Sequence, residues 1–304
     1  MASVFGRWSA AAAAAASLAA GCARPPEPVV PMAIAEAPAP VRPDVPAPSG
    51  ADGRFTKLAP RVGDRHEQSS ATSVTLSIDA GSPAIGNGGR LELTQNDEVT
   101  FALEVLATEG GTTTRASVTV VRAEKTTSHG GLKGTPTPSP IHGKTYVLSL
   151  VKGAVEVNDP DGKSAPGDEA REVREHFRSF GEPDALTQSL PSEPVRPGTP
   201  VPAVARALAH LAGKGSNMTE VTSSDATFRG TAGDAGIFDV VLTLGGAQAP
   251  LGISAELRGE VHVSQRTGAA THVALSGPVT IAGDGSALRG GGTISVVADA
   301  RRLP

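Results

Sequence analysis

Apolar and polar residues alternate over several short stretches of the chain, which is the period-two pattern of half-buried β-strands. Before residue 160 the alternation covers 74–78, 91–105, 118–120, 146–150 and 155–157. After residue 217 it returns over 221–228, 237–244, 257–263, 273–281 and 294–296. Turn-forming residues at 110–114, 159–162 and 265–268 separate neighbouring stretches. The sequence therefore predicts many antiparallel strands joined by turns.

The chain between these two sets of strands has a helical pattern instead. Residues 168–180 begin with acidic residues and are followed by Gly181, both of which are typical of helix ends. A second helix is predicted over 203–212, between Pro202 and Gly213. The proline-rich connection 190–202 is expected to be extended.

This order of elements predicts an α+β fold. We expect mainly antiparallel β-structure, as a curved sheet, partial barrel or sandwich, with two helices inserted between two β halves. The domain would span 68–304, with its helical insert at about 166–213. Apolar helix residues would then close over the concave side, namely Val173, Phe177, Phe180, Val204, Leu208 and Leu211. All of these except Val204 are the candidates to face a ligand. The pattern leaves open whether a cavity remains there or side chains fill it.

The N-terminus has the organisation of a secretory signal peptide, here residues 1–21. Arg7 precedes a small, apolar, alanine-rich run, and Cys22, the only cysteine of 304 residues, follows it. From Ala23 to Gly50 the chain has nine prolines in 28 residues, which favours an extended tether; residues 22–67 are therefore assigned as a linker. A proline-rich ligand for a partner domain is the alternative.

The sequence LAAGC at residues 18–22 resembles the bacterial lipobox, although Ala19 stands where leucine is usual. The resemblance implies that Cys22 is acylated and becomes the new N-terminus after cleavage, so that a lipid anchor holds the protein in the cell envelope. Ala23 after the cysteine favours the outer membrane. An alanine-rich leader with an incidental cysteine is the alternative.

The folded part resembles an uncharacterised family of exported bacterial proteins, many of them lipid-anchored. The resemblance covers about residues 90–302 and rests on GKTYVLSLVKGAVEVNDPDG at 143–162, LPSEPVRPG at 190–198 and LRGEVHVSQRTGAATHVALSG at 257–277. These are strand and turn motifs, so no activity is implied. The order of elements also resembles that of the periplasmic lipoprotein carriers, which implies a sheet that binds an apolar ligand.

Composition and motifs argue against several classes of function. Aromatic residues make up 3% and the net charge is −4 without a long basic run, so a nucleic-acid partner is not expected. Hydrolase, zinc-protease and phosphate-loop motifs are absent from the sequence, so no catalytic residue and no cofactor is expected. His262 and His272 flank the turn at 265–268 with Glu260 nearby. These three residues would form a weak metal site or, alternatively, belong to ordinary polar faces of the strands.

These observations predict a non-catalytic, lipid-anchored envelope protein. Its membrane partner would be reached through Cys22, and its β-rich domain would bind an apolar ligand or an envelope protein. Two alternatives stay open: a structural cell-surface protein without a ligand, and an enzyme with an unrecognised site that acts on envelope polymers.

Overall fold

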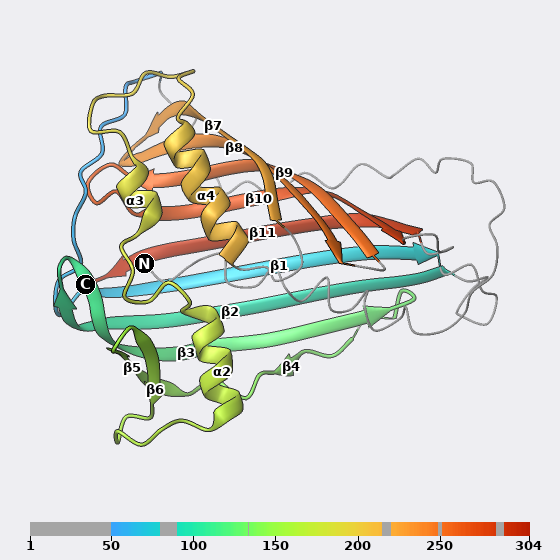
Figure 1. The fold of residues 1–304 in the computed structure, drawn as a ribbon, viewed down its shortest axis with the longest axis horizontal. Coiled ribbons are helices and arrows are strands. Elements are labelled where there is room, and N and C mark those ends of the chain that lie inside the picture. Colours follow the sequence, from blue (N-terminus) through green and yellow to red (C-terminus); the bar gives the residue numbers. More distant parts are fainter. Residues whose placement is uncertain (1–49, 80–89, 133, 215–219, 249–250, 284–288) are drawn as a thin grey trace.

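The computed structural model describes residues 50–79, 90–132, 134–214, 220–248, 251–283 and 289–304 (Figure 1). Cys22, the predicted signal peptide and most of the predicted linker lie outside the described residues. The described chain forms one large antiparallel sheet and a few short helices, which confirms the mainly antiparallel β part of the prediction.

The elements follow the predicted order of strands, helices and strands. The first strands are β1 (Arg65–Asp79), β2 (Arg90–Glu109), β3 (Thr112–His129), β4 (Thr137–Pro138), β5 (Thr145–Val151) and β6 (Ala154–Asn158). The helices are α2 (Gly167–His176), α3 (Ala185–Ser189) and α4 (Pro202–Lys214). The last strands are β7 (Glu220–Ala232), β8 (Ala235–Gln248), β9 (Leu251–Ser264), β10 (Ala270–Gly283) and β11 (Arg289–Leu303). The short helix α3 was not predicted.

The sheet is continuous from one edge to the other and is not closed into a barrel. Its order is β6-β5-β3-β2-β1-β11-β10-β9-β8-β7, with the short β4 beside β3. The first strand therefore lies in the middle and pairs with the last, in register from Arg65 opposite Leu303 to Asp79 opposite Arg289. The helical segment joins the two edge strands, β6 and β7, and lies on one face of the sheet (Figure 1). We call this face the helix side.

The helices bury their apolar residues in two separate clusters on the helix side. The α2 cluster combines Val173 and Phe177 with Val118, Leu148 and other residues of β2, β3, β5 and β6. The α4 cluster combines Leu208 with residues of β7–β11 and β1. Each large, fully buried side chain contributes roughly 1.5–3 kcal/mol through the apolar surface it removes from water. These clusters hold the helices against the sheet.

Polar contacts fix the start of α2 against β5. Glu169, in the first turn, accepts hydrogen bonds from Tyr146 Oη at 2.6 Å and from Lys144 Nζ at 2.8 Å. These two bonds lower the pKa of the Glu169 carboxyl, while burial and the same contact raise the pKa of Tyr146. The helix ends at His176, four residues before the predicted end, because Phe177 leaves helical geometry with φ −114° and ψ 35°.

The ordered contacts of the domain begin before residue 68, the predicted boundary. Gly53 pairs with Val195 through two backbone hydrogen bonds of 2.8 and 2.9 Å. The ring of Phe55 packs against Phe228 and Phe238, with centroids 6.1 and 5.7 Å apart. The end of the predicted linker is therefore part of the folded domain.

Candidate functional site

The residues predicted to face a ligand lie in the packed clusters of the helix side. Val173, Phe177 and Leu208 are fully buried, Phe180 is 7% exposed, and Leu211 is partly buried against the α4 cluster. Val204 is also fully buried. In the described structure these side chains form the core beneath the helices, and a direct contact with a ligand stays a prediction.

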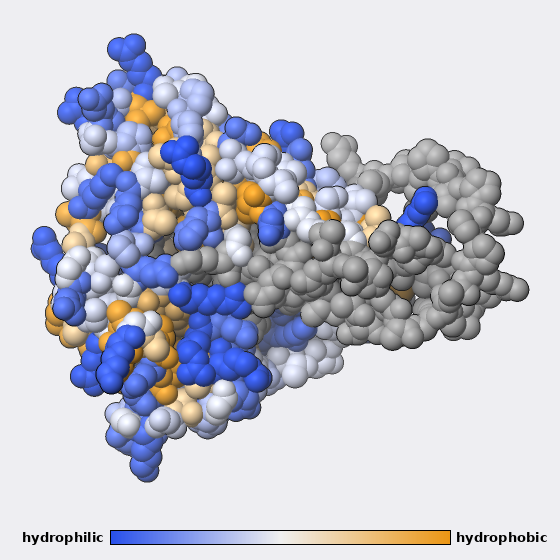
Figure 2. Space-filling model, viewed as in Figure 1, coloured by the Kyte–Doolittle hydropathy of each residue, from blue (hydrophilic) through white to orange (hydrophobic). Residues whose placement is uncertain are grey.

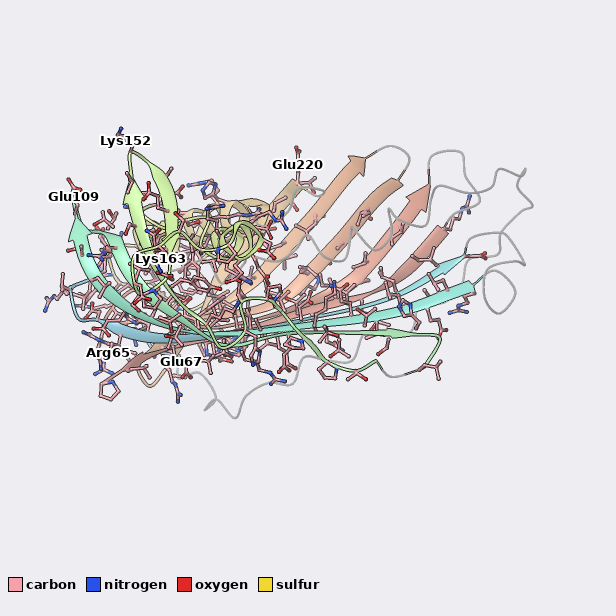
Figure 3. The ribbon with its side chains drawn as sticks, turned by 90° about the horizontal axis from the view of Figure 1, so that it is seen from below. Arg65, Glu67, Glu109, Lys152, Lys163 and Glu220 are labelled. Atoms are coloured by element: carbon pink, nitrogen blue, oxygen red, sulfur yellow. The ribbon has the colours of Figure 1, made fainter. Side chains whose placement is uncertain are left out.

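The helices cover only part of the helix side of the sheet (Figure 3). Figure 3 shows the helices over one end of the sheet, and the strands continue well past Glu220, the first residue of β7. Apolar side chains continue with them on this face: Val74, Leu76, Ile78, Leu93, Val279, Ile281 and Ile294, all buried. We call this set the distal apolar face. Figure 2 shows further apolar side chains beside α2 and α4, among charged ones.

Two glycines of β11, Gly290 and Gly292, leave a strip without side chains within the distal apolar face. Gly290 and Gly292 of β11 lie opposite Ile78 and Leu76 on β1, and opposite Ile281 and Val279 on β10. A Cβ atom at Gly292 would lie 1.8 Å from the Thr75 carbonyl oxygen, so the close approach of β1 and β11 requires glycine there. Rows of apolar side chains therefore flank a stretch of bare backbone.

The opposite face of the sheet carries a row of interacting polar side chains across β7 to β11. We call it the charged row: Arg229, Asp239, Glu260, His262, His272 and Asp299. His262 and His272 are direct register partners on β9 and β10, with ring centroids 5.0 Å apart. The structure thus brings together the two histidines and the glutamate that the sequence singled out.

Each member of the charged row has a partner on the same or a neighbouring strand. Arg229 Nη1 donates to Glu260 Oε2 at 2.7 Å, and Arg229 also pairs with Asp239. Glu260 Oε1 lies 3.1 Å from His262 Nε2, and His272 Nδ1 lies 2.7 Å from Asp299 Oδ1. Each positive or protonatable group of the row therefore contacts at least one carboxylate.

Burial and partner charges set the protonation of the row. Burial lowers the pKa of His262, although the neighbouring Glu260 carboxylate opposes this shift. Burial acts to raise the pKa of Glu260, but hydrogen bonding to Arg229 and the nearby His262 lower it overall. The pKa of Arg229 is raised, first by its hydrogen bonds with Asp239. At neutral pH Arg229 and Glu260 are thus ionised and His262 is uncharged.

A hollow of roughly 350 Å³ lies beside the charged row. Arg229, Asp239, Arg258 and Glu260 contribute charged groups, and Gly259, Ala274 and Ser276 are among the small residues that line it. Both arginines are already paired with carboxylates, Arg229 with Glu260 at 2.7 Å and Arg258 with Glu256 at 2.6 Å. The charges of the hollow are therefore satisfied within the protein.

The charged row lacks the groups that its most familiar chemistries require. Within the described residues, no group of three or more His, Cys, Asp or Glu side chains could hold a metal ion. His272 is oriented by Asp299 in the manner of a catalytic base, but among the described residues no serine, threonine or cysteine side chain donates a hydrogen bond to either imidazole ring. The arrangement fits ion pairing across strands better than nucleophilic or metal chemistry.

Three members of the charged row were not singled out from the sequence. Arg229, Asp239 and Asp299 come from β7, β8 and β11, whose pairing to β9 and β10 no short motif records. Their only signal is a polar residue at alternate positions of an apolar strand. His262 and His272 were easier to pair because one turn joins their strands.

Comparison with known proteins leaves the family of the chain open. No family model matches the sequence, and no curated protein matches it. Among solved structures, lipovitellin, described for its lipid–protein interactions, is 6% identical at a TM-score of 0.30; the likeness covers 80% of this chain and 26% of lipovitellin. DynF from the dynemicin biosynthesis pathway of Micromonospora chersina is 8% identical at a TM-score of 0.22, and the likeness covers 87% of this chain and 92% of DynF.

A third similar structure is an outer membrane channel from Pseudomonas putida F1. It is 10% identical at a TM-score of 0.22, and the likeness covers 82% of this chain and 98% of the channel. Scores this low carry no argument about function. Within the described part of the chain, no helix combines the length and apolar character that crossing a membrane would require.

Proposed function

We propose that this protein is a non-catalytic lipoprotein of the bacterial envelope, anchored through Cys22, whose sheet binds an apolar ligand on its helix side. The anchor rests on the sequence alone, since Cys22 lies outside the described residues. The ligand proposal rests chiefly on one observation: the strands extend past the helices (Figures 1 and 3), and the sheet has buried apolar residues along this part of the helix side.

The shape of the distal apolar face suits a long, narrow ligand. Leu76 and Ile78 flank Gly290 and Gly292 on one side, and Val279 and Ile281 flank them on the other. Apolar rows on both sides of bare backbone would bury an alkyl chain along much of its length. Each methylene removed from water contributes about 0.8 kcal/mol. A lipid acyl chain is therefore the ligand class that we propose.

The ligand proposal is tested by probe binding to the soluble domain, residues 50–304, once circular dichroism has shown that it folds. Native mass spectrometry would count bound hexadecyl probes. Leu93→Ser replaces an apolar side chain of the distal apolar face by a polar one, and we expect it to weaken binding about tenfold or more, because a hydroxyl group buried against an alkyl chain costs about 1–3 kcal/mol. Thr94→Ser, one residue along on the opposite face, is the matched control.

Two results would overturn the ligand proposal. One is a domain that binds no hexadecyl probe at micromolar concentration. The other is binding that residues 23–49 abolish when they are restored, because this segment of the same chain would then be the occupant of the face. Equal loss of binding in both variants would also count against the distal apolar face as the site.

The anchor is tested separately, by intact-mass measurement of the protein extracted from bacterial membranes. We expect a mature chain that begins at Cys22 and carries acyl mass, and we expect Cys22→Ala to lack it. An unacylated chain that keeps residues 1–21 would refute the anchor and leave the ligand proposal to be judged alone.

A further inference from the structure

Two buried polar side chains interrupt the apolar helix side of β2. Gln95 and Asp97 are each 5% exposed, and they alternate on one face of the strand with the apolar residues Leu93 and Val99. Gln95 Nε2 donates a hydrogen bond of 2.8 Å to Asp97 Oδ2. This bond holds the carboxylate in place and leaves its second oxygen to face elsewhere.

Among the described residues, no donor forms a hydrogen bond with the second carboxylate oxygen of Asp97. Oδ1 is buried and accepts no hydrogen bond in the described structure. Lys125 is opposite Asp97 in the pairing of β2 and β3, but its side chain is exposed and makes no hydrogen bond to this oxygen. Buried acceptors are nearly always satisfied, because leaving one unpaired forfeits its hydration without compensation. Asp97 Oδ1 is therefore a buried acceptor for which the described residues supply no hydrogen-bond donor.

The position of Asp97 relates it to the distal apolar face. Its register partner on β1 is Thr72, and the strand continues from there through Val74 and Leu76 to Ile78. At ~3.3 Å per residue, the path from Thr72 to Ile78 is about 20 Å long. A ligand with its polar end at Asp97 would thus lay its alkyl chain along the apolar rows.

We propose that Asp97 binds the polar head of the ligand, and that the ligand is an amphipathic lipid whose head donates a hydrogen bond. An amine or ammonium head should bind more tightly than a hydroxyl head. Gln95 positions the carboxylate. A carboxylate head is disfavoured, because it would bring a second negative charge against Asp97 in a buried site. This inference rests on the proposed function, since it names the class of lipid that the same face binds.

The test compares three probes with one chain length: hexadecylamine, hexadecanol and hexadecanoic acid. Binding of each to the folded domain is measured by native mass spectrometry or equilibrium dialysis at neutral pH. We expect the amine to bind at least tenfold more tightly than the acid, with the alcohol between them. Asp97→Asn should reduce the amine-to-acid ratio to below threefold, because the charge is lost while the shape is kept.

Glu98→Gln is the matched control. It removes the same charge from the next residue of β2, whose side chain pairs with Arg122 on the opposite face. We expect it to leave the order of the three probes unchanged. Because the head-group order of the wild-type domain needs no variant, the inference stays testable even if Asp97→Asn folds poorly.

The outcomes separate this inference from the proposed function. If no probe binds, both fail. If all three bind equally well, or the acid binds best, the apolar site stands and the role of Asp97 is overturned. A ratio that Glu98→Gln lowers as much as Asp97→Asn would also overturn it, because the preference would then reflect overall charge.

Discussion

Arg229 is expected to contribute most of the ionic stabilisation of the charged row. Its side chain is 27% exposed and contacts Glu260, which is 10% exposed, at 2.7 Å. At an effective dielectric constant of about 20, two unit charges at this separation attract each other by about 6 kcal/mol before the cost of desolvation. Breaking a buried pair costs about 3–5 kcal/mol, and the partial exposure of Arg229 reduces this figure to about 2–4 kcal/mol.

The perturbation is Arg229→Met, which keeps an unbranched apolar stem and removes the guanidinium charge. The free energy of unfolding is measured by urea titration at pH 7 and low salt. Arg258→Met is the control on the same face, because Arg258 is 68% exposed and its pair with Glu256 should contribute less than about 1 kcal/mol. The double variant Arg229→Met/Glu260→Gln should regain most of the lost stability, since it no longer buries an unpaired carboxylate.

The pH dependence gives an independent check of the same reasoning. The pKa of Glu260 is lowered in the folded protein, mainly through Arg229 and His262 against the effect of burial. Its ionised form therefore stabilises the fold above the ordinary carboxyl pKa, and this contribution is lost as the pH falls through the lowered value. Arg229→Met should weaken this acid-side loss. The reasoning is refuted if Arg229→Met costs no more than Arg258→Met, or if the double variant regains nothing.

Three further predictions concern single side chains. Burial lowers the pKa of His262, so just below the ordinary histidine pKa the unfolded chain binds more protons than the folded protein does. The free energy of unfolding should therefore decrease as the pH falls from about 7 to about 5. In urea titrations His262→Gln should remove part of this decrease, whereas His210→Gln, at an exposed residue, should not. Phe177→Ala should lower the free energy of unfolding by about 3–5 kcal/mol, because Phe177 is fully buried. Val121 is 52% exposed, so Val121→Ala should lower it by less than about 1 kcal/mol. Glu169→Gln should speed amide hydrogen exchange in α2, because its contact with Lys144 becomes uncharged; unchanged exchange would refute this anchoring role.

Local features of the fold were predictable from the sequence. The turn at 265–268 joins β9 and β10, and the alternation on either side of it matches the buried residues of both strands. The helices α2 and α4 also occur where the helical periodicity indicated, although α2 ends before the predicted residue and α4 includes Pro202 and Gly213, which were predicted to flank it. These features depend on neighbours within a few residues, which is the range over which sequence patterns act.

Long-range pairing was not predictable. The pairing of β1 with β11 joins residues more than 200 positions apart, and no local pattern selects one strand over another as partner. The short helix α3 escaped notice because five residues are too few to show a helical period. Its N-cap residue is Asp184, whose carboxylate accepts a hydrogen bond from the Leu186 amide, a cap that could have been recognised.

The two faces of the sheet specify the same strand register. On β9 and β10, Val261 and Val273 face the helix side as direct partners, while His262 and His272 pair on the opposite face. A slip of one residue would move every side chain of a strand to the other face. Apolar residues would then meet water, and buried charges such as Glu260 would enter the core without Arg229. A charged row with this role needs no substrate, which is why we propose ligand binding on the helix side and a stabilising role for the row.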